Sequence, residues 1–337
     1  MNSGALRPNG DFVNSKVKLD LAIGDYPHTA ALVSGEIPIE DVEPNFIKVV
    51  PQIGAYRRMV RQVEFDVCDL APTTYIIARA YGAPFKALPI FVMRRFHHSG
   101  LLVRPDARVK HPKDLEGRKV GVRAYSVTTG VWLRGILMDE YGVDNSKITW
   151  VVDDEEHVTQ LKLPENVVHA PQGRSLADMM ADGELAAGLE ANAGIGRSGS
   201  PTGGGWQARE TNYPQLFDNA EELEAAWYRK TGIYPIHGTI VVKDAMLEQH
   251  PWVARSLFDA FAKAKAQWLI KLRSGEAQAA TDKKYRKFCE FVGDDPLPYG
   301  TKANLPTMEA LADTAFKQKL TPRHMTMSET FVEIESA

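Results

Sequence analysis

Cysteine is scarce in this chain of 337 residues. The two cysteines, Cys68 and Cys289, lie far apart in the sequence, and neither belongs to a CxxC pair. This excludes zinc and redox motifs that are built on paired cysteines. Residues 1–24 also contain no apolar run of the length that a secretory signal needs. We therefore expect a protein of the reducing cytoplasm.

Long apolar runs and blocks of like charge are absent too. No stretch of about 18 apolar residues is present, so we expect no transmembrane helix and no membrane partner. The formal net charge of -3 and the pI near 6.3 show no excess of basic residues, which argues against a nucleic-acid partner. A chain of this length usually forms about two domains. The sequence leaves the oligomeric state open, and a homo-oligomer is compatible with it.

The first half of the chain alternates short apolar segments with helical patterns. One helical stripe of apolar residues runs from Ile53 to Val63, and a second helix begins at Pro72, a residue type that is favoured in the first turn. This alternation predicts an α/β fold with a parallel, doubly wound sheet. The predicted strands are 18–23, 46–50, 65–70, 87–91 and 100–103.

The alternation restarts after residue 110, which predicts a second lobe. The elements expected there are strands at 119–122, 148–152 and 185–189 and helices at 126–142 and 175–181. A later strand at 238–243 and a long helix at 251–273 indicate a return to the first lobe. We therefore predict a discontinuous first lobe of residues 1–103 and 238–337, and a second lobe of residues 104–237.

A glycine-rich stretch, "GIGRSGSPTGGGW", covers residues 194–206. It contains the GxGxxG spacing of dinucleotide-binding loops, but that motif requires a helix to begin at once. The letters "SPTGGG" do not favour a helix. We therefore predict a flexible loop without a phosphate, with a lid over the ligand site as one role for it.

A helix start rich in hydroxyl groups follows the strand at 119–122. Ser126, Thr128 and Thr129 stand there, where free backbone N–H groups and the positive end of the helix dipole favour an anion. The candidate ligand is a carboxylate or a phosphate. The alternative is that these hydroxyls only cap the helix.

Several blocks together resemble one known family. They are "GDYPHT" (24–29), "FDVCDLAPTTY" (65–75), "ALPIFVMRRFHHSG" (87–100), "VGVRAYSVTTGVWLRGILMDEYGVD" (120–144) and "TGIYPIHG" (231–238). From about residue 18 to residue 270 the chain resembles the 4,5-dihydroxyphthalate decarboxylase family. This resemblance implies a two-lobed, type II periplasmic-binding-protein-like α/β fold with a ligand cleft between the lobes.

The resemblance also implies an activity. It points to a carboxy-lyase that works without a cofactor on 4,5-dihydroxyphthalate or a close analogue, and that yields CO2 and a protocatechuate-type product. Without an organic cofactor the ring itself must accept electrons: a proton adds to the carbon that bears the carboxylate, and a ring hydroxyl ortho or para to it stabilises the cation. The site then needs a carboxylate anchor, a proton donor and an acceptor for the phenol.

Arginine is the natural anchor, because its guanidinium binds a carboxylate through two parallel hydrogen bonds. Our candidates are Arg95 and Arg123, together with the helix start described above, and Arg94 is an alternative to Arg95. Ser99 and Thr74 lie in the family-like blocks and are further candidates for substrate binding. Arg134 lies within a helix, where we expect a structural ion pair.

Histidine is the natural proton donor near neutral pH. His98 is our first candidate and His237 the second, while His97 stands where relatives often carry arginine and could hold a carboxylate instead. Asp25 follows the first strand, at an edge that lines ligand crevices in α/β sheets. It could accept the phenolic proton or orient a histidine, or it could be a turn residue. Asp69 has a similar position and less support.

A resident metal ion is not expected. The segment "DDEEH", residues 153–157, contains ligand types, yet adjacent residues on one loop seldom converge on one ion, so we predict a solvated acidic loop. The rival to the decarboxylase is a solute-binding or sensing protein that closes on a small aromatic anion without chemistry. The paired histidines favour the enzyme, although fold alone does not establish a reaction.

Overall fold

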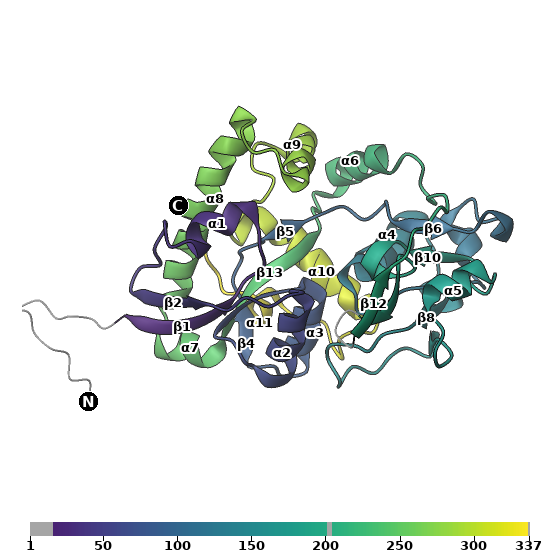
Figure 1. Cartoon of the computed structure of the whole chain (residues 1–337), viewed down its shortest axis with the longest axis horizontal. Coiled ribbons are helices and arrows are strands. Elements are labelled where there is room, and N and C mark those ends of the chain that lie inside the picture. The colour runs from purple at the N-terminus through teal and green to yellow at the C-terminus, as the bar shows by residue number, and fades with distance from the viewer. Residues whose placement is uncertain (1–15, 201–203, 336–337) are drawn as a thin grey trace, which may run out of the picture.

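The computed structural model describes residues 16–200 and 204–335, which form two lobes side by side along the long axis of the molecule (Figure 1). The first lobe is built on a sheet in the order β2-β1-β3-β13-β4, with β5 also paired to β13. Its strands are β1 (Val17–Ala22), β2 (Val42–Phe46), β3 (Val67–Leu70), β4 (Phe85–Ala87), β5 (Met93–Arg94) and β13 (Ile236–Lys243). β1, β2 and β3 are parallel, whereas β13 runs antiparallel to its neighbours, so the sheet is mixed.

The second lobe has its own sheet in the order β6-β10-β7-β8-β9. Its strands are β6 (Leu101–Val103), β7 (Lys119–Gly121), β8 (Thr149–Val152), β9 (Val167–His169) and β10 (Ala187–Leu189). Here β7, β8, β9 and β10 are parallel, and only β6 is antiparallel. β6 pairs with β10, so residues 101–103, which the sequence pattern assigns to the first lobe, lie in the second sheet.

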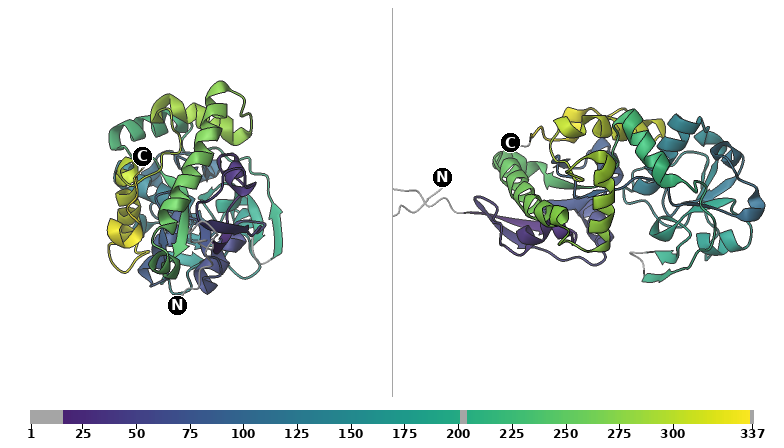
Figure 2. Two further views of the ribbon diagram at one scale, coloured as in Figure 1. Left: turned by 90° about the vertical axis from the view of Figure 1, so that its left-hand side faces the viewer. Right: turned by 90° about the horizontal axis from the view of Figure 1, so that it is seen from above.

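Helices surround both sheets. They are α1 (Ala30–Val33), α2 (Ile53–Gln62), α3 (Pro72–Ala80), α4 (Thr128–Tyr141), α5 (Leu176–Ala181), α6 (Ala220–Thr231), α7 (Asp244–Gln249), α8 (Val253–Ser274), α9 (Ala280–Val292), α10 (Leu305–Lys317) and α11 (Met327–Thr330). The long helix α8 covers the end of the first lobe that faces away from the second (Figure 2). None of the helices in the described ranges combines the length and apolarity needed to cross a membrane.

The strongest helical patterns of the sequence appear as helices with the expected ends. The apolar stripe of α8, from Val253 to Trp268, is buried in the first lobe. α4 ends where Gly142 adopts a left-handed conformation (φ 64°), which a glycine reaches without steric cost. α3 begins at Pro72. Periodicity and terminal residues thus suffice for these elements.

Three segments differ from the sequence predictions. The strand expected at 87–91 is instead β4 at 85–87, because Pro89 has no N–H with which to continue the ladder. The strand expected at 46–50 is instead β2 at 42–46, because Val42 is buried whereas Val50 is exposed. The glycine-rich stretch is not simply a loop: Arg197–Ser200 and Gly204–Ala208 pair as the antiparallel strands β11 and β12. Residues 201–203, which belong to the same prediction, lie outside the described residues. Two antiparallel strands pair through backbone groups across a short connection, and glycine carries the same backbone N–H and C=O groups as other residues.

The lobes share a continuous apolar core. α10 packs against α3 of the first lobe and α4 of the second. Arg134 of α4 is fully buried beside it, donates to the Gln318 side chain (2.6 Å) and stacks on Tyr125 and Trp150. The ion pair expected for Arg134 is therefore not found among the described residues. Its guanidinium instead donates to the amide oxygen of Gln318 and lies over two aromatic rings. This packing joins the two sheets into one hydrophobic unit.

Candidate functional site

Strand direction brings several predicted residues of the first lobe to one edge. β1 and β3 are parallel, so the segments that follow them, which contain Gly24 and Ala71, emerge together. β13 is antiparallel to β3, so its beginning, at His237, reaches the same edge. β5 pairs with this start of β13 and places Arg95 nearby. The edge therefore collects residues that are more than 200 positions apart in the chain.

The parallel strands of the second lobe do the same on the facing side. Arg123 follows β7, the segment 153–157 follows β8, and Glu190 follows β10. α4 begins at Thr128, just after Arg123. The carboxyl ends of neighbouring parallel strands form the usual ligand crevice of α/β sheets. The two crevices face each other across the junction of the lobes.

A cavity of about 380 Å³ lies between these two edges. This volume is within the range of small-molecule sites. From the first lobe it is lined by Ile53, Tyr56, Ala71, Thr74, Met93, Arg95 and His237. From the second lobe it is lined by Arg123, Ala124, Ser126, Val127, Thr128, Thr129, His157, Glu190, Ala191, Asn192 and Ala193. Seven of the sequence-predicted site residues thus meet in one cavity: Thr74, Arg95, Arg123, Ser126, Thr128, Thr129 and His237.

A carboxylate of the protein itself occupies part of the predicted anion site. Glu156 accepts hydrogen bonds from the backbone N–H groups of Tyr125 (2.6 Å) and Ser126 (3.2 Å), and from the Ser126 hydroxyl. Thr128 is engaged by the Thr73 hydroxyl of the first lobe (2.7 Å). Ser126 and Thr128 therefore line the cavity but bond to other groups of the protein, whereas the Thr129 hydroxyl accepts a hydrogen bond from Arg95.

Arg95 is the arginine that reaches the cavity from the first lobe. It is half-buried and donates to the Thr129 hydroxyl across the lobe junction (3.2 Å). No carboxylate of the described residues lies within ion-pair distance of it. Arg94, the alternative, is buried in the first-lobe core, where it bonds to Tyr234 and Asn304. Successive residues of an extended segment point to opposite sides, which separates the two arginines.

Arg123 is already paired by the protein. It is 5% exposed and lies 3.1 Å from a carboxylate oxygen of Asp154. Asp154 also pairs with Arg57 of α2 at 3.3 Å. The acidic segment predicted to be solvated is therefore largely engaged with arginines, and Asp153 likewise pairs with Arg197. Within the described residues, His, Cys, Asp and Glu side chains form no group of three or more that could hold a metal ion.

His237 is the histidine of the predicted set that faces the cavity. Its ring lies 5.3 Å from that of His97, centroid to centroid, and His97 is completely buried behind it. Burial holds the pKa of both rings well below the usual value, and the positive charge of Arg95 lowers each of them further. Both rings are therefore neutral in the unliganded site.

Three predicted residues lie elsewhere. His98 is buried against the rings of Phe217 and Trp227, and its burial lowers its pKa to about 4. Ser99 is exposed and borders a different hollow beside α6 and α9. Asp25 is exposed. Its position after β1 fits the crevice rule, but its side chain does not line the cavity.

Sequence reasoning missed several groups that line or support the cavity. Tyr56 belongs to the apolar helical stripe between Ile53 and Val63, which gives no sign of a site. Glu190 directly follows a predicted strand, so the crevice rule could have found it. Glu156 and His157 lie in the acidic segment that was considered only for metal binding. Asp69, given little weight, is fully buried next to the cavity wall and accepts a hydrogen bond from Tyr26.

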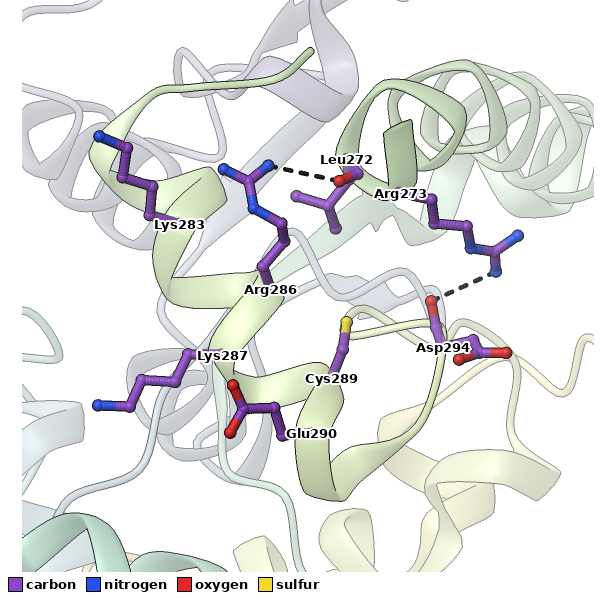
Figure 3. A pocket seen from close by; sticks show the side chains of 8 residues that line it. All are labelled: Leu272, Arg273, Lys283, Arg286, Lys287, Cys289, Glu290 and Asp294. Atoms are coloured by element: carbon purple, nitrogen blue, oxygen red, sulfur yellow. Dashed lines mark hydrogen bonds between the residues drawn. The ribbon is translucent and has the colours of Figure 1, made fainter. Parts of the chain in front are cut away.

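A second, more open groove of about 610 Å³ lies between the end of α8 and α9 (Figure 3). No predicted site residue lines it. Two of its arginines are held by backbone carbonyls, Arg286 by Leu272 and Arg273 by Asp294, both at 3.3 Å. We therefore assign the functional site to the smaller cavity between the lobes, where charged and polar groups from both sheets converge.

Comparison with known proteins places the chain. It is 32% identical over 332 residues to the 4,5-dihydroxyphthalate decarboxylase of Comamonas testosteroni, an alignment that covers 94% of this chain and 97% of that protein. The chain belongs to the 4,5-dihydroxyphthalate decarboxylase family. A second member of this family, from Pseudomonas putida, is 34% identical over 181 residues, which are 51% of this chain and 70% of that protein.

Family and fold agree with the two-lobed architecture. Residues 43–180 match the family of the periplasmic substrate-binding proteins of phosphonate ABC transporters. The sulfonate-binding protein SsuA of Methylobacillus flagellatus KT superposes with a TM-score of 0.52 at 12% identity, covering 95% of this chain and 93% of that one. SsuA of Escherichia coli gives 0.51 at 12% identity, covering 96% and 95%. The predicted periplasmic-binding-protein-like fold is thereby confirmed.

Proposed function

We propose that this protein is a decarboxylase that removes CO2 from a hydroxylated aromatic dicarboxylate of the 4,5-dihydroxyphthalate type. The relatives across nearly the full chain support the reaction class. The observation that supports a site for it is the interlobe cavity, in which Arg95 meets hydrogen-bond donors of α4 and a histidine. A volume of about 380 Å³ accommodates one substituted benzene ring.

Arg95 anchors a substrate carboxylate in this proposal. Its guanidinium is held by an uncharged hydroxyl, so it can exchange that contact for a charge-assisted pair with the ligand. The first turn of α4 adds backbone N–H groups beside it, and Val127 at the start of α4 makes no side-chain cap. Arg123 reaches the same cavity and adds positive potential, tempered by its pairing with Asp154.

His237 donates the proton to the ring carbon. Its pKa is depressed by burial and by Arg95, so it is rarely protonated in the empty site. A bound dicarboxylate neutralises Arg95 and contributes negative charge of its own, which raises the histidine pKa towards neutrality. Substrate binding thus favours the protonated form of the ring. His97 packs behind it with its ring tilted by 35° and limits the orientation of the His237 ring.

The second candidate function is solute binding without a reaction. It is supported by the shared fold of the phosphonate-type family and the sulfonate-binding proteins. Those matches are at 12% identity for the structures, whereas the decarboxylases align at 32%. We therefore rank the enzyme first. The cytoplasmic location and a homo-oligomeric state stay predictions.

The test is turnover of a panel of hydroxylated benzene mono- and dicarboxylates, followed as CO2 release and as deuterium at the vacated ring position in D2O. We expect His237→Asn to lower kcat at least a hundredfold with little change in affinity, because proton transfer occurs only on the way to the transition state. His98→Asn is the matched comparison and should keep kcat near that of wild type.

Arg95→Gln should instead raise KM or Kd about tenfold or more, the usual scale of a lost charge-assisted contact. A wild-type protein that binds these acids without releasing CO2 would support the solute-binding candidate. If His237→Asn kept full activity and His98→Asn lost it, the proton donor would be a group outside the cavity.

A further inference from the structure

A buried carboxyl group lies beneath the cavity and has no role in the steps above. Asp69 lies on β3 with 0% exposure, and one of its oxygens, Oδ1, has no hydrogen-bond partner within the described structure. Its other oxygen, Oδ2, accepts from the Tyr26 hydroxyl at 2.6 Å. A carboxyl group that is buried without a cation is costly and calls for a physical explanation.

Tyrosine hydroxyls connect this carboxyl group to the cavity. Tyr26 donates to Asp69 at 2.6 Å. Its hydroxyl also acts on Tyr56, where it offsets part of the rise in pKa that burial causes. Tyr56 lines the cavity from α2. Asp69 of β3, Tyr26 of the segment after β1 and Tyr56 of α2 lead from the buried carboxyl group to the cavity. Such a chain can transmit a proton, because each hydroxyl both donates and accepts.

Backbone packing holds the path in place. A Cβ atom on Gly24 would lie 2.9 Å from Asp69 Oδ2 and 2.8 Å from the Tyr26 ring, so only glycine allows these two side chains to meet there. Gly238, next to His237 on β13, lies close to the other oxygen of Asp69, because a Cβ atom at that position would be 3.3 Å from Oδ1. The carboxyl group is thus built in between β1 and β13.

We propose that Asp69 is a positioning base which, through Tyr26 and Tyr56, accepts the proton of a substrate phenol. This inference rests on the proposed decarboxylation and assigns its missing third role, the acceptor for the ring hydroxyl. The class of substrate is thereby narrowed to aromatic acids with a hydroxyl on the side of the ring that faces Tyr56.

Each turnover moves protons and electron pairs between the substrate, the relay and His237 in a closed cycle. The phenol O–H bond breaks and its proton passes to the Tyr56 oxygen, while Tyr56 passes its own proton to Tyr26 and Tyr26 passes its proton to Asp69. The phenolate electron pair enters the ring as the carboxylate-bearing carbon takes a proton from His237. The C–C bond then breaks, its electron pair stays with the ring, and CO2 leaves. The relay finally returns its proton to the product oxygen. Solvent reprotonates His237.

The charges around Asp69 suit a base that works near neutral pH. Burial raises its pKa to about 7, offset in part by hydrogen bonds from Tyr26 and Gly24. The facing groups are the two tyrosines and the neighbouring thiol of Cys68, whose pKa values are raised by burial and by this carboxylate. Asp69 is therefore the most acidic group of the cluster and is ionised first as the pH rises. A base with a pKa near the working pH transfers protons most effectively.

The first experiment needs no turnover. The affinities of 3,4-dihydroxybenzoate and 3,4-dimethoxybenzoate are measured by calorimetry from pH 5.5 to 8 for wild type, Asp69→Asn and Tyr56→Phe. In wild type the preference for the phenol should grow about tenfold as Asp69 ionises, because an ionised acceptor strengthens the chain. The preference should be independent of pH in both variants. A pH-independent preference in wild type overturns the relay, whatever the turnover shows.

The second experiment uses the reaction. Asp69→Asn, Tyr26→Phe and Tyr56→Phe should each lower kcat at least thirtyfold with KM changed only a few-fold, and the rise of kcat through about pH 7 should disappear. A fluorine ortho to the reacting hydroxyl makes the phenol more acidic and should restore part of the loss in Asp69→Asn. A merely structural role predicts no such rescue, and its absence counts against the proposal.

Asp66→Asn is the matched control, because Asp66 lies just before β3 and pairs with Lys243 away from the cavity. It should keep the pH dependence of wild type. If wild type shows the pH-dependent phenol preference but releases no CO2 from any acid tested, the relay stands and the proposed decarboxylation fails.

Discussion

At the scale of single residues, the site depends on which charges the protein has already neutralised. Glu156 accepts hydrogen bonds from Ser126, just before α4, and Asp154 pairs with Arg123. Arg95 lacks such a partner among the described residues. Because a substrate carboxylate gains most from a cation that is not already paired, Arg95 outranks the other candidates as the anchor.

Asp69 gives a residue-scale prediction for stability. Its pKa is about 7 in the folded protein and near 3.8 when unfolded, so the folded state binds a proton that the unfolded state has lost between these values. The contribution of Asp69 to the free energy of unfolding is therefore fully present below the pKa of the unfolded state, and it is lost as the pH rises to about 7. Asp69→Asn removes the titrating group, so the variant does not lose stability in this way as the pH rises.

We expect the free energy of unfolding of Asp69→Asn minus that of wild type to increase by roughly 3 kcal/mol between about pH 5 and pH 8, so that the variant gains stability relative to wild type. Urea unfolding of both proteins at the two pH values measures it, and all other titrating groups cancel in the comparison. An equal difference at both pH values would mean that the Asp69 pKa is not raised.

At the scale of elements, helix α2 links the lobes next to the cavity. Arg57 of α2 pairs with Asp154 and Glu155 of the loop after β8, and Arg61 pairs with Glu155 (2.8 Å). These residues belong to different lobes. The pairs therefore stabilise the arrangement in which the cavity is enclosed, and they add little to the stability of either lobe alone.

We predict that Arg57→Gln weakens substrate affinity about three- to tenfold, since binding then has to supply the energy of closing the lobes. Arg58→Gln is the control: Arg58 lies on the same helix but pairs with Glu64 in its own lobe, and both side chains are partly exposed. Its affinity should match wild type. Calorimetry with 3,4-dihydroxybenzoate decides between them, and equal affinity of the two variants would show that the interlobe pairs do not support the closed site.

At the scale of the whole molecule, α10 makes the two lobes one cooperative unit. It packs on α3 and α4, and Gln318 at its end bonds to Arg134 and to the Val131 carbonyl of α4. Leu311, at its centre, is completely buried. An apolar core that crosses the junction couples the unfolding of one lobe to that of the other.

We expect a single calorimetric unfolding transition for wild type and a loss of about 2–5 kcal/mol in Leu311→Ala, the usual cost of a large cavity in a core. Ile270→Ala on α8 is the comparison, because that side chain is 69% exposed and should cost little. Two separate transitions in wild type would contradict the coupling and make the lobes independent domains.

The positions of most helices and strands, and the class of the protein, follow from local sequence patterns. Helix α8 follows from its apolar spacing, and the end of helix α4 follows from Gly142, both of which are local properties. The family-like blocks were enough to predict the two-lobed fold, which similar proteins confirm. Local rules also identified Arg95 and His237 as candidates, although they could not separate them from their sequence neighbours.

Which of the candidate residues meet depends on contacts between segments that are distant in the chain. Arg95 and His237 face the cavity between the lobes, whereas Arg94 and His97 are buried in the core. This difference depends on strand pairing between distant segments. The same holds for Asp69, whose burial against Gly24 and Tyr26 gives it a partner and a raised pKa that no local pattern encodes. Spacing along the chain fixes secondary structure, whereas burial and charge pairing arise from contacts across it.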